Sequence, residues 1–517
     1  MNMTILLRTA RSVTVQLEDG GLYASEKAYR LTLNDRPAGE MTTVVRSLFG
    51  LWPDTAYVLR AFDGDTEVAS VNFTTEAESF TMNVRRFGAV GDGEHDDTSA
   101  IQAAILACPA QGRVLIPAGR YRVRPLFLKS HIRLELAAGA VLELERDRSL
   151  FPILPGMTLS TDEASDYNLG TWEGNPMDMF GSLITGIDVE DVVIYGEGVC
   201  NGMAQLSDWW VEHRTRRGAW RGRLLYLCRC REISVQGVTF RNSPAWNLHP
   251  YFSRELKFLN VSVQAPADSP NTDGFDPESC KGILVAGAHF SLGDDCIAIK
   301  AGKLYMGMTY ATPCEDILIS HCLMENGHGG VTIGSEMAGG VRNVRVRDCL
   351  MRCTDRGLRV KTRRGRGRNG VIEDIEFERV RMDRVGTPFV VNALYFCDPD
   401  GHSEYVQSRE KQPVDDRTPR IGRIAFRSMQ ATGVSCAGYF LGLPERPIEE
   451  VLLEDVSIAC APDAQPMRPA MADGVELCVR KGLVADGVDR LRLHRVNISG
   501  YEGDRLTLHQ VGEVDEQ

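Results

Sequence analysis

Short strands with an apolar-x-apolar pattern recur from about residue 180 to the end of the chain, and this recurrence constrains the fold most. The copies lie at 233–235, 256–258, 283–285, 317–319, 344–346, 375–377, 424–426, 451–453 and 491–493. From Ile283 to Ile317, Val344 and Ile375, the steps by subtraction are 34, 27 and 31 residues. That irregular period predicts a β-solenoid whose turns carry loops of varying length. No helical pattern separates the strands, which disfavours a TIM barrel or a doubly wound sheet.

Residues 1–80 are predicted to form a separate, small β-sandwich domain. Segments 12–17 and 29–33 alternate between apolar and polar residues, as half-buried strands do. The segment 51–59 carries Pro-x-Thr-x-Tyr before an alternating strand, and it resembles the tyrosine corner of fibronectin type III sandwiches. We expect this module to pack on the rest of the chain or to act as a spacer.

The remaining residues, 81–517, are expected to form one all-β solenoid domain. It opens at 83–93, and Asp97-Thr98 supplies a helix N-cap before a helical pattern over 100–107. Segments 112–117 and 119–123 then have the pattern of short strands. This layout resembles the N-terminal cap of right-handed parallel β-helix proteins that act on pectin and related polymers.

Charge and composition narrow the range of partners. The formal net charge is -12 and the sequence pI is about 5.5, which argues against nucleic acid as a partner. Two basic clusters, at 214–223 and 359–368, favour an anionic ligand in a positive groove. No apolar run is long enough to span a membrane, so no membrane partner is expected. The sequence does not indicate an oligomeric state.

Cysteine usage and the first residues bear on metal binding and location. Fourteen cysteines are scattered without a compact framework, which is typical of reduced, buried thiols. Cys228 and Cys230 form a lone Cys-x-Cys, so neither a metal nor another cofactor is predicted. The first residues lack a secretory signal, which favours a cytoplasmic enzyme and leaves export open.

Four polar clusters lie inside the repeat at spacings close to one solenoid turn. They are Asn271-Thr272-Asp273-Gly274, Gly293-Asp294-Asp295-Cys296, Gly327-His328-Gly329-Gly330 and Arg359-Val360-Lys361. The steps from Asp273 to Asp295, His328 and Lys361 are 22, 33 and 33 residues. Equivalent positions of successive turns stack about 4.8 Å apart, so we expect these residues to converge on one patch.

Three neighbouring aspartates would provide a proton donor and a base in one place, as glycoside hydrolysis requires. Inverting glycosidases separate the two groups by roughly 6.5–9.5 Å to admit a water. Asp294 and Asp295 cannot both project from one face of a regular strand, so a bend at Gly293 is expected. His328 is expected to hold a carboxylate in its working state.

The order Asn-Thr-Asp, Gly-Asp-Asp, Gly-His-Gly, Arg-x-Lys resembles glycoside hydrolase family 28, the polygalacturonases. The resemblance implies a right-handed parallel β-helix that inverts configuration without a metal. It further implies that Asp294 is the general acid, that Asp273 and Asp295 position and deprotonate a water, and that His328 tunes the aspartates. The substrate would be an anionic pectic polysaccharide or oligogalacturonide.

The same resemblance assigns residues that bind substrate. Arg359 and Lys361, two apart on one strand face, would bind a galacturonate carboxylate, and Asn271 would support that site. Tyr395 matches a tyrosine that contacts substrate, and Trp172 is a candidate for stacking on a sugar ring.

A longer match concerns the mode of cutting. Segment 329–343 resembles bacterial exo-acting members of the family, which also carry an N-terminal fibronectin-like module. An exo-acting enzyme needs loops that close one end of its groove. The candidates are 171–174, the Trp209-Trp210 pair and the loop 397–420, where the repeat lengthens to 49 residues between Ile375 and Ile424.

Two other functions remain open on the same fold. A pectate lyase would bind calcium through Asp273, Asp294 and Asp295 and use Arg359 as the base. A non-catalytic, pectin-binding β-helix would bind the polymer without cleaving it, although it has little use for three aspartates beside a histidine.

Overall fold

The computed structural model describes residues 1–159 and 166–517, and it begins with a small sandwich of two antiparallel sheets. Its strands are β1 (Asn2–Arg8), β2 (Ser12–Glu18), β3 (Ala24–Leu33), β4 (Arg36–Thr43), β5 (Val45–Phe49), β6 (Ala56–Asp63) and β7 (Thr66–Thr74). The sheet β1-β2-β5 faces the sheet β4-β3-β6-β7 across a core that includes Val15, Leu31 and Leu59. The Tyr57 hydroxyl accepts a hydrogen bond from the Trp52 backbone N–H at 2.9 Å, as the predicted tyrosine corner requires.

From residue 81 onward, parallel strands wind into a solenoid with three ladders, of which the first carries the candidate site. The first ladder contains β12 (Leu126–Phe127), β21 (Ile184–Ile187), β24 (Leu225–Cys228), β27 (Leu248–Tyr251), β32 (Ile297–Ile299), β35 (Val331–Ile333), β38 (Arg356–Lys361), β41 (Thr387–Asn392) and β44 (Cys436–Leu441). Single bridges through Phe275 join β27 to β32 across the one turn that has no named strand there.

The second ladder is the longest. It contains β8 (Thr81–Asn83), β10 (Gly112–Ile116), β13 (Ile132–Leu136), β22 (Glu190–Gly196), β25 (Arg231–Gln236), β28 (Arg254–Leu259), β30 (Lys281–Ala286), β33 (Cys314–Ser320), β36 (Val341–Arg347), β39 (Val371–Glu378) and β42 (Arg420–Ile421). The third contains β9 (Asp92–Asp96), β11 (Gly119–Val123), β14 (Ala140–Leu144), β23 (Val199–Asn201), β26 (Thr239–Arg241), β29 (Ser262–Gln264), β31 (His289–Leu292), β34 (Leu323–Asn326), β37 (Leu350–Arg352) and β40 (Arg381–Asp383). Four long strands close the solenoid: β43 (Arg423–Val434), β45 (Ile448–Cys460), β46 (Lys481–Ser499) and β47 (Leu506–Glu516).

The nine apolar-x-apolar copies predicted from sequence all fall in one ladder and in one register. Ile233 pairs with Leu256, Leu256 with Ile283, and the series continues without a shift to Leu491. The first and third residue of each copy point into the core, while the middle residue is more exposed in most copies. The predicted all-β, right-handed parallel β-helix is therefore confirmed, and apolar stacking between turns holds it together.

The first turn is capped by η1 (Val84–Phe87) and α1 (Thr98–Ala107), close to the predicted helix. The Asp97 side chain does not cap α1, which differs from expectation. Its carboxylate instead accepts hydrogen bonds from the backbone N–H groups of Val90 and Gly91, at 2.6 and 3.0 Å. The buried aspartate thus closes the 83–93 turn rather than the helix.

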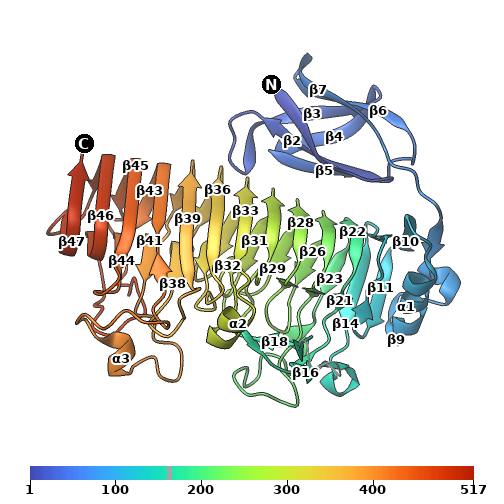
Figure 1. The fold of residues 1–517 in the computed structure, drawn as a ribbon. Coiled ribbons are helices and arrows are strands. Elements are labelled where there is room, and N and C mark those ends of the chain that lie inside the picture. Colours follow the sequence, from blue (N-terminus) through green and yellow to red (C-terminus); the bar gives the residue numbers. More distant parts are fainter. Residues whose placement is uncertain (160–165) are drawn as a thin grey trace.

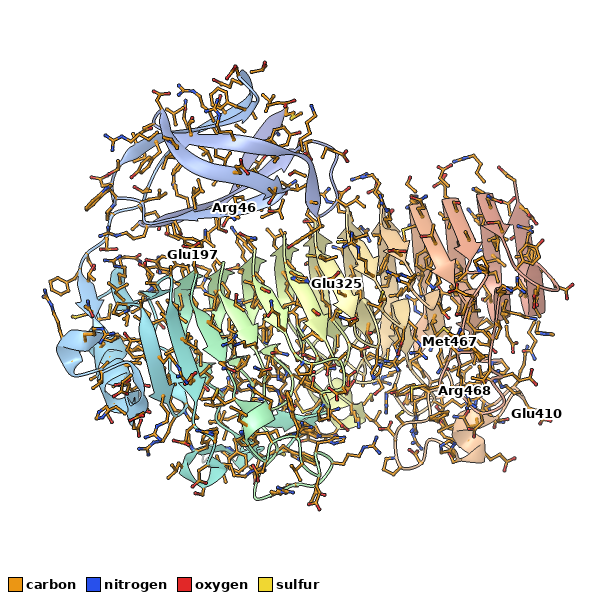
Figure 2. All side chains as sticks on the ribbon, turned by 180° about the vertical axis from the view of Figure 1, so that it is seen from behind. Arg46, Glu197, Glu325, Glu410, Met467 and Arg468 are labelled. Carbon is orange, nitrogen blue, oxygen red and sulfur yellow. The ribbon has the colours of Figure 1, made fainter. Side chains whose placement is uncertain are left out.

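The sandwich packs against the second and third ladders (Figure 1). Val45 of β5 lies in an apolar cluster with Leu259 and Ala286 of the solenoid. The buried Gln236 amide accepts a hydrogen bond from Ser12 at 2.7 Å and donates one to Thr14 at 2.6 Å. Figure 2 shows Arg46 on this boundary. Apolar contacts and paired buried polar groups together fix the sandwich on the solenoid.

Long loops project on the side away from the sandwich, where Figure 1 places α2 and α3 and Figure 2 places Met467, Arg468 and Glu410. These loops contain the remaining elements: η2 (Arg148–Leu150), β15 (Ile153–Leu154), β16 (Thr158–Leu159), β17 (Asp166–Tyr167), β18 (Thr171–Trp172), β19 (Asn175–Pro176), β20 (Met179–Phe180), η3 (Ala204–Leu206), α2 (Leu304–Thr309) and α3 (Glu404–Gln407). In the described part of the chain, no helix is long and apolar enough to cross a membrane.

Candidate active site

Three aspartates from two neighbouring turns meet midway along the first ladder, just before Phe275 and before β32. The Gly274 N–H donates to the Asp295 carbonyl at 3.0 Å, and Phe275 pairs with Ile297, so Asp273 and Asp295 lie side by side. One carboxylate oxygen of each of Asp273, Asp294 and Asp295 lies within 4.8 Å of the other two. The structure therefore brings together the aspartates that the spacing predicted.

The backbone between the third and first ladders lets Asp294 and Asp295 reach the same cavity. Strand β31 ends at Leu292 and β32 begins at Ile297, so the two aspartates lie in a turn, as expected. The φ angle of Gly293 lies outside the left-handed region, but a Cβ at this position would lie 2.5 Å from the Ser269 carbonyl oxygen. The glycine is required for close approach rather than for an unusual dihedral angle.

Two cations hold Asp295 from two turns further along the solenoid. Arg359 Nη1 lies 3.0 Å from Oδ1, and Lys361 Nζ lies 2.9 Å from Oδ2. Burial alone favours the protonated acid, but Lys361 and Arg359 together hold the pKa of Asp295 well below its usual range. Gly329 leaves the room that this arrangement needs, since a Cβ there would lie 2.9 Å from Oδ1 of Asp295. Asp295 is therefore a fixed anion.

Asp273 has the opposite environment. It is buried, and its Oδ1 accepts no hydrogen bond from the described residues. Burial raises its pKa well above the usual range, and the charges of Asp294 and Asp276 raise it further, while Lys300 opposes them. Two cations thus hold Asp295 as an anion, whereas burial opposes a charge on Asp273 and Lys300 favours it.

His328 contacts a carboxylate outside the cluster. Its Nδ1 lies 2.8 Å from Asp355 Oδ2, and that hydrogen bond raises the pKa of the imidazole. Its backbone N–H donates to the Asp294 carbonyl oxygen at 3.2 Å. The carboxylate that His328 contacts is therefore Asp355 rather than one of the three clustered aspartates, whose charges also raise the pKa of His328.

A cavity of about 440 Å³ contains the cluster, and it is lined by all but one of the residues predicted from sequence. Asn271 lies on its wall and accepts a hydrogen bond from Arg221 at 2.6 Å. Tyr395 also lines it, with the Lys361 ammonium 5.8 Å from the ring centroid. The cavity thus has carboxylates on one part of its wall and cations beside them.

Trp172 is the exception, and its prediction as an open stacking surface is wrong. The ring is 4% exposed and is stacked between Trp220, at 4.6 Å, and Trp246, at 5.8 Å. Arg221 and Arg223 lie over the Trp172 ring at 5.2 and 5.0 Å. Both faces of Trp172 are therefore occupied, and Trp246 is the tryptophan that lines the cavity.

Several cavity residues were not predicted from sequence: Trp246, Lys300, Lys303, Glu336, Asp355 and Met471. A usable signal existed for Lys300, because it follows β32, the strand that begins just after Asp295. Met471 had none, since it belongs to the loop between β45 and β46, which carries no recognisable motif. Arg359 Nη2 lies 3.1 Å from the Met471 sulfur.

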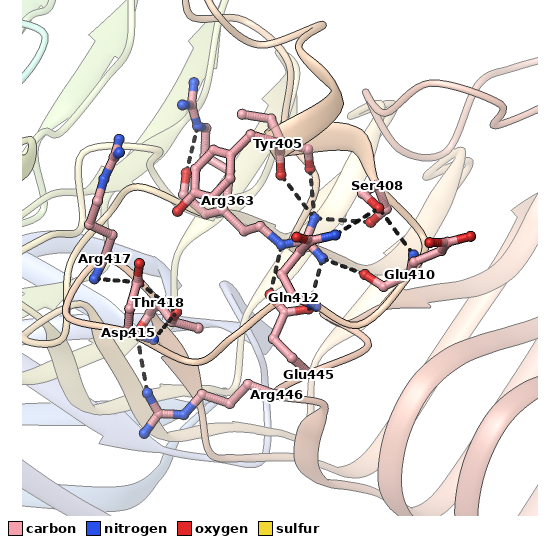
Figure 3. A network of polar contacts seen from close by, with 12 residues as sticks. Arg363, Tyr405, Ser408, Glu410, Gln412, Asp415, Arg417, Thr418, Glu445 and Arg446 are labelled. Atoms are coloured by element: carbon pink, nitrogen blue, oxygen red, sulfur yellow. Dashed lines mark hydrogen bonds and ion pairs between the residues drawn. The ribbon is translucent and has the colours of Figure 1, made fainter.

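The predicted loop 397–420 forms one wall and is anchored by a buried arginine. Arg364 donates to both carboxylate oxygens of Glu445 at 2.6 and 2.7 Å, and to the Ser408 carbonyl oxygen at 2.9 Å. Figure 3 shows Ser408, Gln412 and Glu445 in this network. Lys303 Nζ lies 3.0 Å from Asp398, which joins the loop to the residues after β32.

Comparison with known proteins identifies the family. The model described as "Glycosyl hydrolases family 28" matches residues 135–464, and one described as "Rhamnogalacturonase A/epimerase, pectate lyase-like" matches residues 81–135. A "Probable polygalacturonase" of Vitis vinifera is 31% identical over 390 residues, covering 73% of this chain and 74% of that protein.

The chain belongs to glycosyl hydrolases family 28.

Solved structures of the family share its fold. An exopolygalacturonase from Thermotoga maritima is 26% identical, with a TM-score of 0.65, covering 81% of this chain and 92% of that chain. A family 28 exopolygalacturonase from Yersinia enterocolitica is 18% identical, with a TM-score of 0.69, covering 99% of this chain and 98% of that chain. The second likeness extends over the sandwich of this family 28 protein as well as its solenoid.

The ion pairs of Asp295 generate a stability prediction. We expect Lys361→Met to lower the free energy of unfolding at pH 7 by about 3–5 kcal/mol, because it leaves a buried carboxylate with one counter-charge fewer. The folded pKa of Asp295 is depressed, so the ion pairs stabilise the fold fully above the unfolded pKa of about 3.9, and this stabilisation is lost as the pH falls from there through the depressed folded pKa. Urea unfolding at pH 7 measures the cost of the substitution, and a series that continues downward from about pH 4 measures the loss.

Lys281→Met is the matched control, because Lys281 pairs with Glu315 at 2.8 Å on the exposed surface. Its cost should stay below about 1 kcal/mol. Equal costs for the two variants would contradict the assignment of Asp295 as a buried, paired anion.

Proposed function

We propose that this family 28 hydrolase cleaves α-1,4-galacturonosyl linkages of polygalacturonate or oligogalacturonides with inversion of configuration. The observation that carries the proposal is the cluster of Asp273, Asp294 and Asp295, in which two cations hold Asp295 ionised beside two further carboxyl groups of the same cavity. Glycoside hydrolysis needs both a proton donor and an anionic base, and such a cluster can supply both. The cations beside the cluster suit an anionic sugar.

We assign the role of general acid to Asp294, and the binding and deprotonation of the attacking water to Asp273 and Asp295. Asp294 is the least buried of the three and lines the cavity, so its carboxyl group is accessible to the glycosidic oxygen. Asp295, fixed as an anion, and Asp273 would orient and deprotonate the attacking water. Their approach within 4.8 Å is shorter than the roughly 6.5–9.5 Å of inverting enzymes that use two carboxylates. In a two-carboxylate enzyme, the water occupies the space between the acid and the base. Here Asp273 and Asp295 would hold the water together, so Asp294 need not be separated from them by that distance.

Arg359 and Lys361 are placed to bind a substrate carboxylate while they neutralise Asp295. Among the described residues, Arg359 Nη2 hydrogen-bonds only to the Met471 sulfur, and Lys361 uses one of its three N–H groups on Asp295. Their free N–H groups would bind the anionic sugar. Asn271 and Tyr395, on the same cavity wall, would complete this part of the site.

The lyase alternative requires Arg359 as a base, and its environment opposes that role. Burial favours the neutral guanidine, but the charges of Asp295, Tyr395 and Asp294 outweigh it and raise the pKa of Arg359. A guanidinium bound to a buried carboxylate does not take up a proton. These residues therefore fit a hydrolase better than a lyase.

Asp294→Asn tests the acid role. We expect kcat on polygalacturonate to fall by about 10²–10⁴-fold, because an amide cannot protonate the leaving oxygen. Asp374→Asn, an exposed aspartate on the second ladder, is the control and should retain the activity of the wild-type protein. Reducing-sugar release measures both, and full activity of Asp294→Asn would exclude the assignment.

The products of the wild-type protein separate hydrolysis from elimination in the same assay. We expect saturated galacturonate, with release unchanged by a chelator. Unsaturated, ultraviolet-absorbing products that disappear in chelator would instead support the lyase.

We further propose that the enzyme cuts from a chain end. Lys303 joins two of the loops that were expected to close the groove, since its ammonium lies 3.0 Å from Asp398 and 3.7 Å from Glu173. Its backbone N–H also donates to the Gly174 carbonyl oxygen at 2.8 Å. Because Lys303 joins these loops across the groove, the groove favours entry of the end of a polysaccharide over passage of a continuous polysaccharide.

Time-resolved product analysis tests the mode of cutting. An exo-acting enzyme should release one short product from the first minute, while the viscosity of the polymer falls slowly. An early ladder of intermediate oligomers with a rapid fall in viscosity would show endo cutting.

A further inference from the structure

A fully buried lysine, Lys300, lies next to Asp273. It follows β32, and its side chain is 3% exposed. Its ammonium lies 3.9 Å from Asp273 Oδ2, 3.2 Å from Asp276 Oδ1 and 4.4 Å from the centroid of the Trp246 ring. Within the described residues, Lys300 is the one cation whose nitrogen lies within 4 Å of the Asp273 carboxylate. None of the four sequence motifs includes it.

The other charged groups around this pair are arranged unevenly. Asp273 faces Asp294, Asp295 and Asp276 as well as Lys300, with Arg221 and Arg223 farther away. Lys300 faces Glu336, Asp276, Asp273 and Asp295, and it also influences Glu173, Glu278 and His249. Three carboxylates thus act on Asp273, and among the described residues Lys300 is the cation that offsets their repulsion at close range.

The two arginines near Asp273 are engaged elsewhere. Arg221 donates to Asn271 at 2.6 Å and to the Pro244 carbonyl oxygen at 2.8 Å. Arg223 lies over the Trp246 ring at 4.4 Å, and its Nε lies 3.3 Å from His249 Nδ1. Arg359 and Lys361 hold Asp295. Asp295 and Asp273 are therefore neutralised by different cations: Arg359 and Lys361 lie against Asp295, and Lys300 lies against Asp273.

Asp276 competes with Asp273 for that ammonium. It is completely buried, it lies closer to Lys300 than Asp273 does, and neither of its oxygens has a hydrogen-bond partner among the described residues. Burial raises the pKa of Asp276 to about 7, with Lys300 opposing that rise. An ionised Asp276 would add a third negative neighbour to Asp273 and share its only close cation.

We propose that Lys300 is a positioning residue that keeps Asp273 in its ionised, water-binding form, and that Asp276 opposes it. The inference rests on the proposed hydrolytic function, in which Asp273 must be anionic to accept a proton from water. Lys300 contributes by charge and by its fixed place behind the carboxylate. The pair Lys300 and Asp276 thereby sets the pH below which the enzyme loses activity.

The proposal requires two substitutions to act in opposite directions. The acid limb of kcat/KM reports ionisation of the base in the free enzyme, and activity is lost as the pH falls through the pKa of that base. Removing the ammonium in Lys300→Met raises the pKa of Asp273, so the limb should move to higher pH by about one to two units. Because the pKa of Asp276 is about 7, Asp276 carries a full charge only above that pH, so Asp276→Asn should move the limb to lower pH by a smaller amount.

Profiles of kcat/KM on short oligogalacturonides from pH 3 to pH 8 measure both shifts. Lys300→Arg keeps the charge and should restore most of the wild-type limb. Lys281→Met is the matched control, because Lys281 pairs with Glu315 on the exposed surface and does not line the cavity. It removes the same charge and should leave the limb within about 0.3 units of the wild-type position, because screening weakens distant charges.

Opposite shifts for Lys300→Met and Asp276→Asn, with rescue by Lys300→Arg, would support the proposal. An unmoved limb in both variants, or shifts in the same direction, would overturn it. If Lys300→Met does not fold, as a thermal unfolding scan would reveal, the direction of the Asp276→Asn shift decides. Failure of the wild-type protein to release galacturonate would refute the proposed function itself, which separates the two outcomes.

Discussion

The register between neighbouring turns of the solenoid is the constraint on which the site depends. Backbone hydrogen bonds pair Phe275 with Ile297, and Ile297 with Val331, so residues far apart in sequence occupy adjacent positions at a fixed spacing. Asp273 and Asp295 are neighbours for this reason. A shift of one residue would turn every core side chain of a turn outward, so the apolar stacking that stabilises the fold also fixes the geometry of the carboxylates.

That forced proximity creates an electrostatic problem which the surrounding side chains resolve asymmetrically. Three carboxylates in a partly buried cavity repel one another, and each ionised group loses solvation. Two cations from β38 stabilise Asp295, while Lys300 is the one cation at close range to Asp273 among the residues that the structure describes. The result is a difference between otherwise identical side chains, which is what acid–base catalysis requires. The basic residues at 359–368 therefore pair with the protein's own carboxylates, and binding of an anionic sugar by Arg359 and Lys361 is the proposed addition to that role.

Much of the fold and the location of the site could be predicted from sequence, because both follow from periodic, local patterns. The nine apolar copies align in one ladder, and the four motifs lie along one cavity, since solenoid geometry maps sequence steps onto neighbouring positions. Side-chain partners are different, because they depend on loops that have no period. Trp172 is covered by Trp220 and Trp246, and His328 is bound by Asp355 rather than by the cluster.

The central claim is that a protonated carboxyl group and a water held by two carboxylates act on opposite sides of one glycosidic bond. Proton NMR of the product during the first minutes of hydrolysis of an α-1,4-linked oligogalacturonide tests this most directly. If water attacks the anomeric carbon opposite the leaving oxygen, the β-anomer of the newly formed reducing end should appear first and then equilibrate. Initial release of the α-anomer would indicate a covalent intermediate and would contradict the assignment of Asp273 and Asp295 to water.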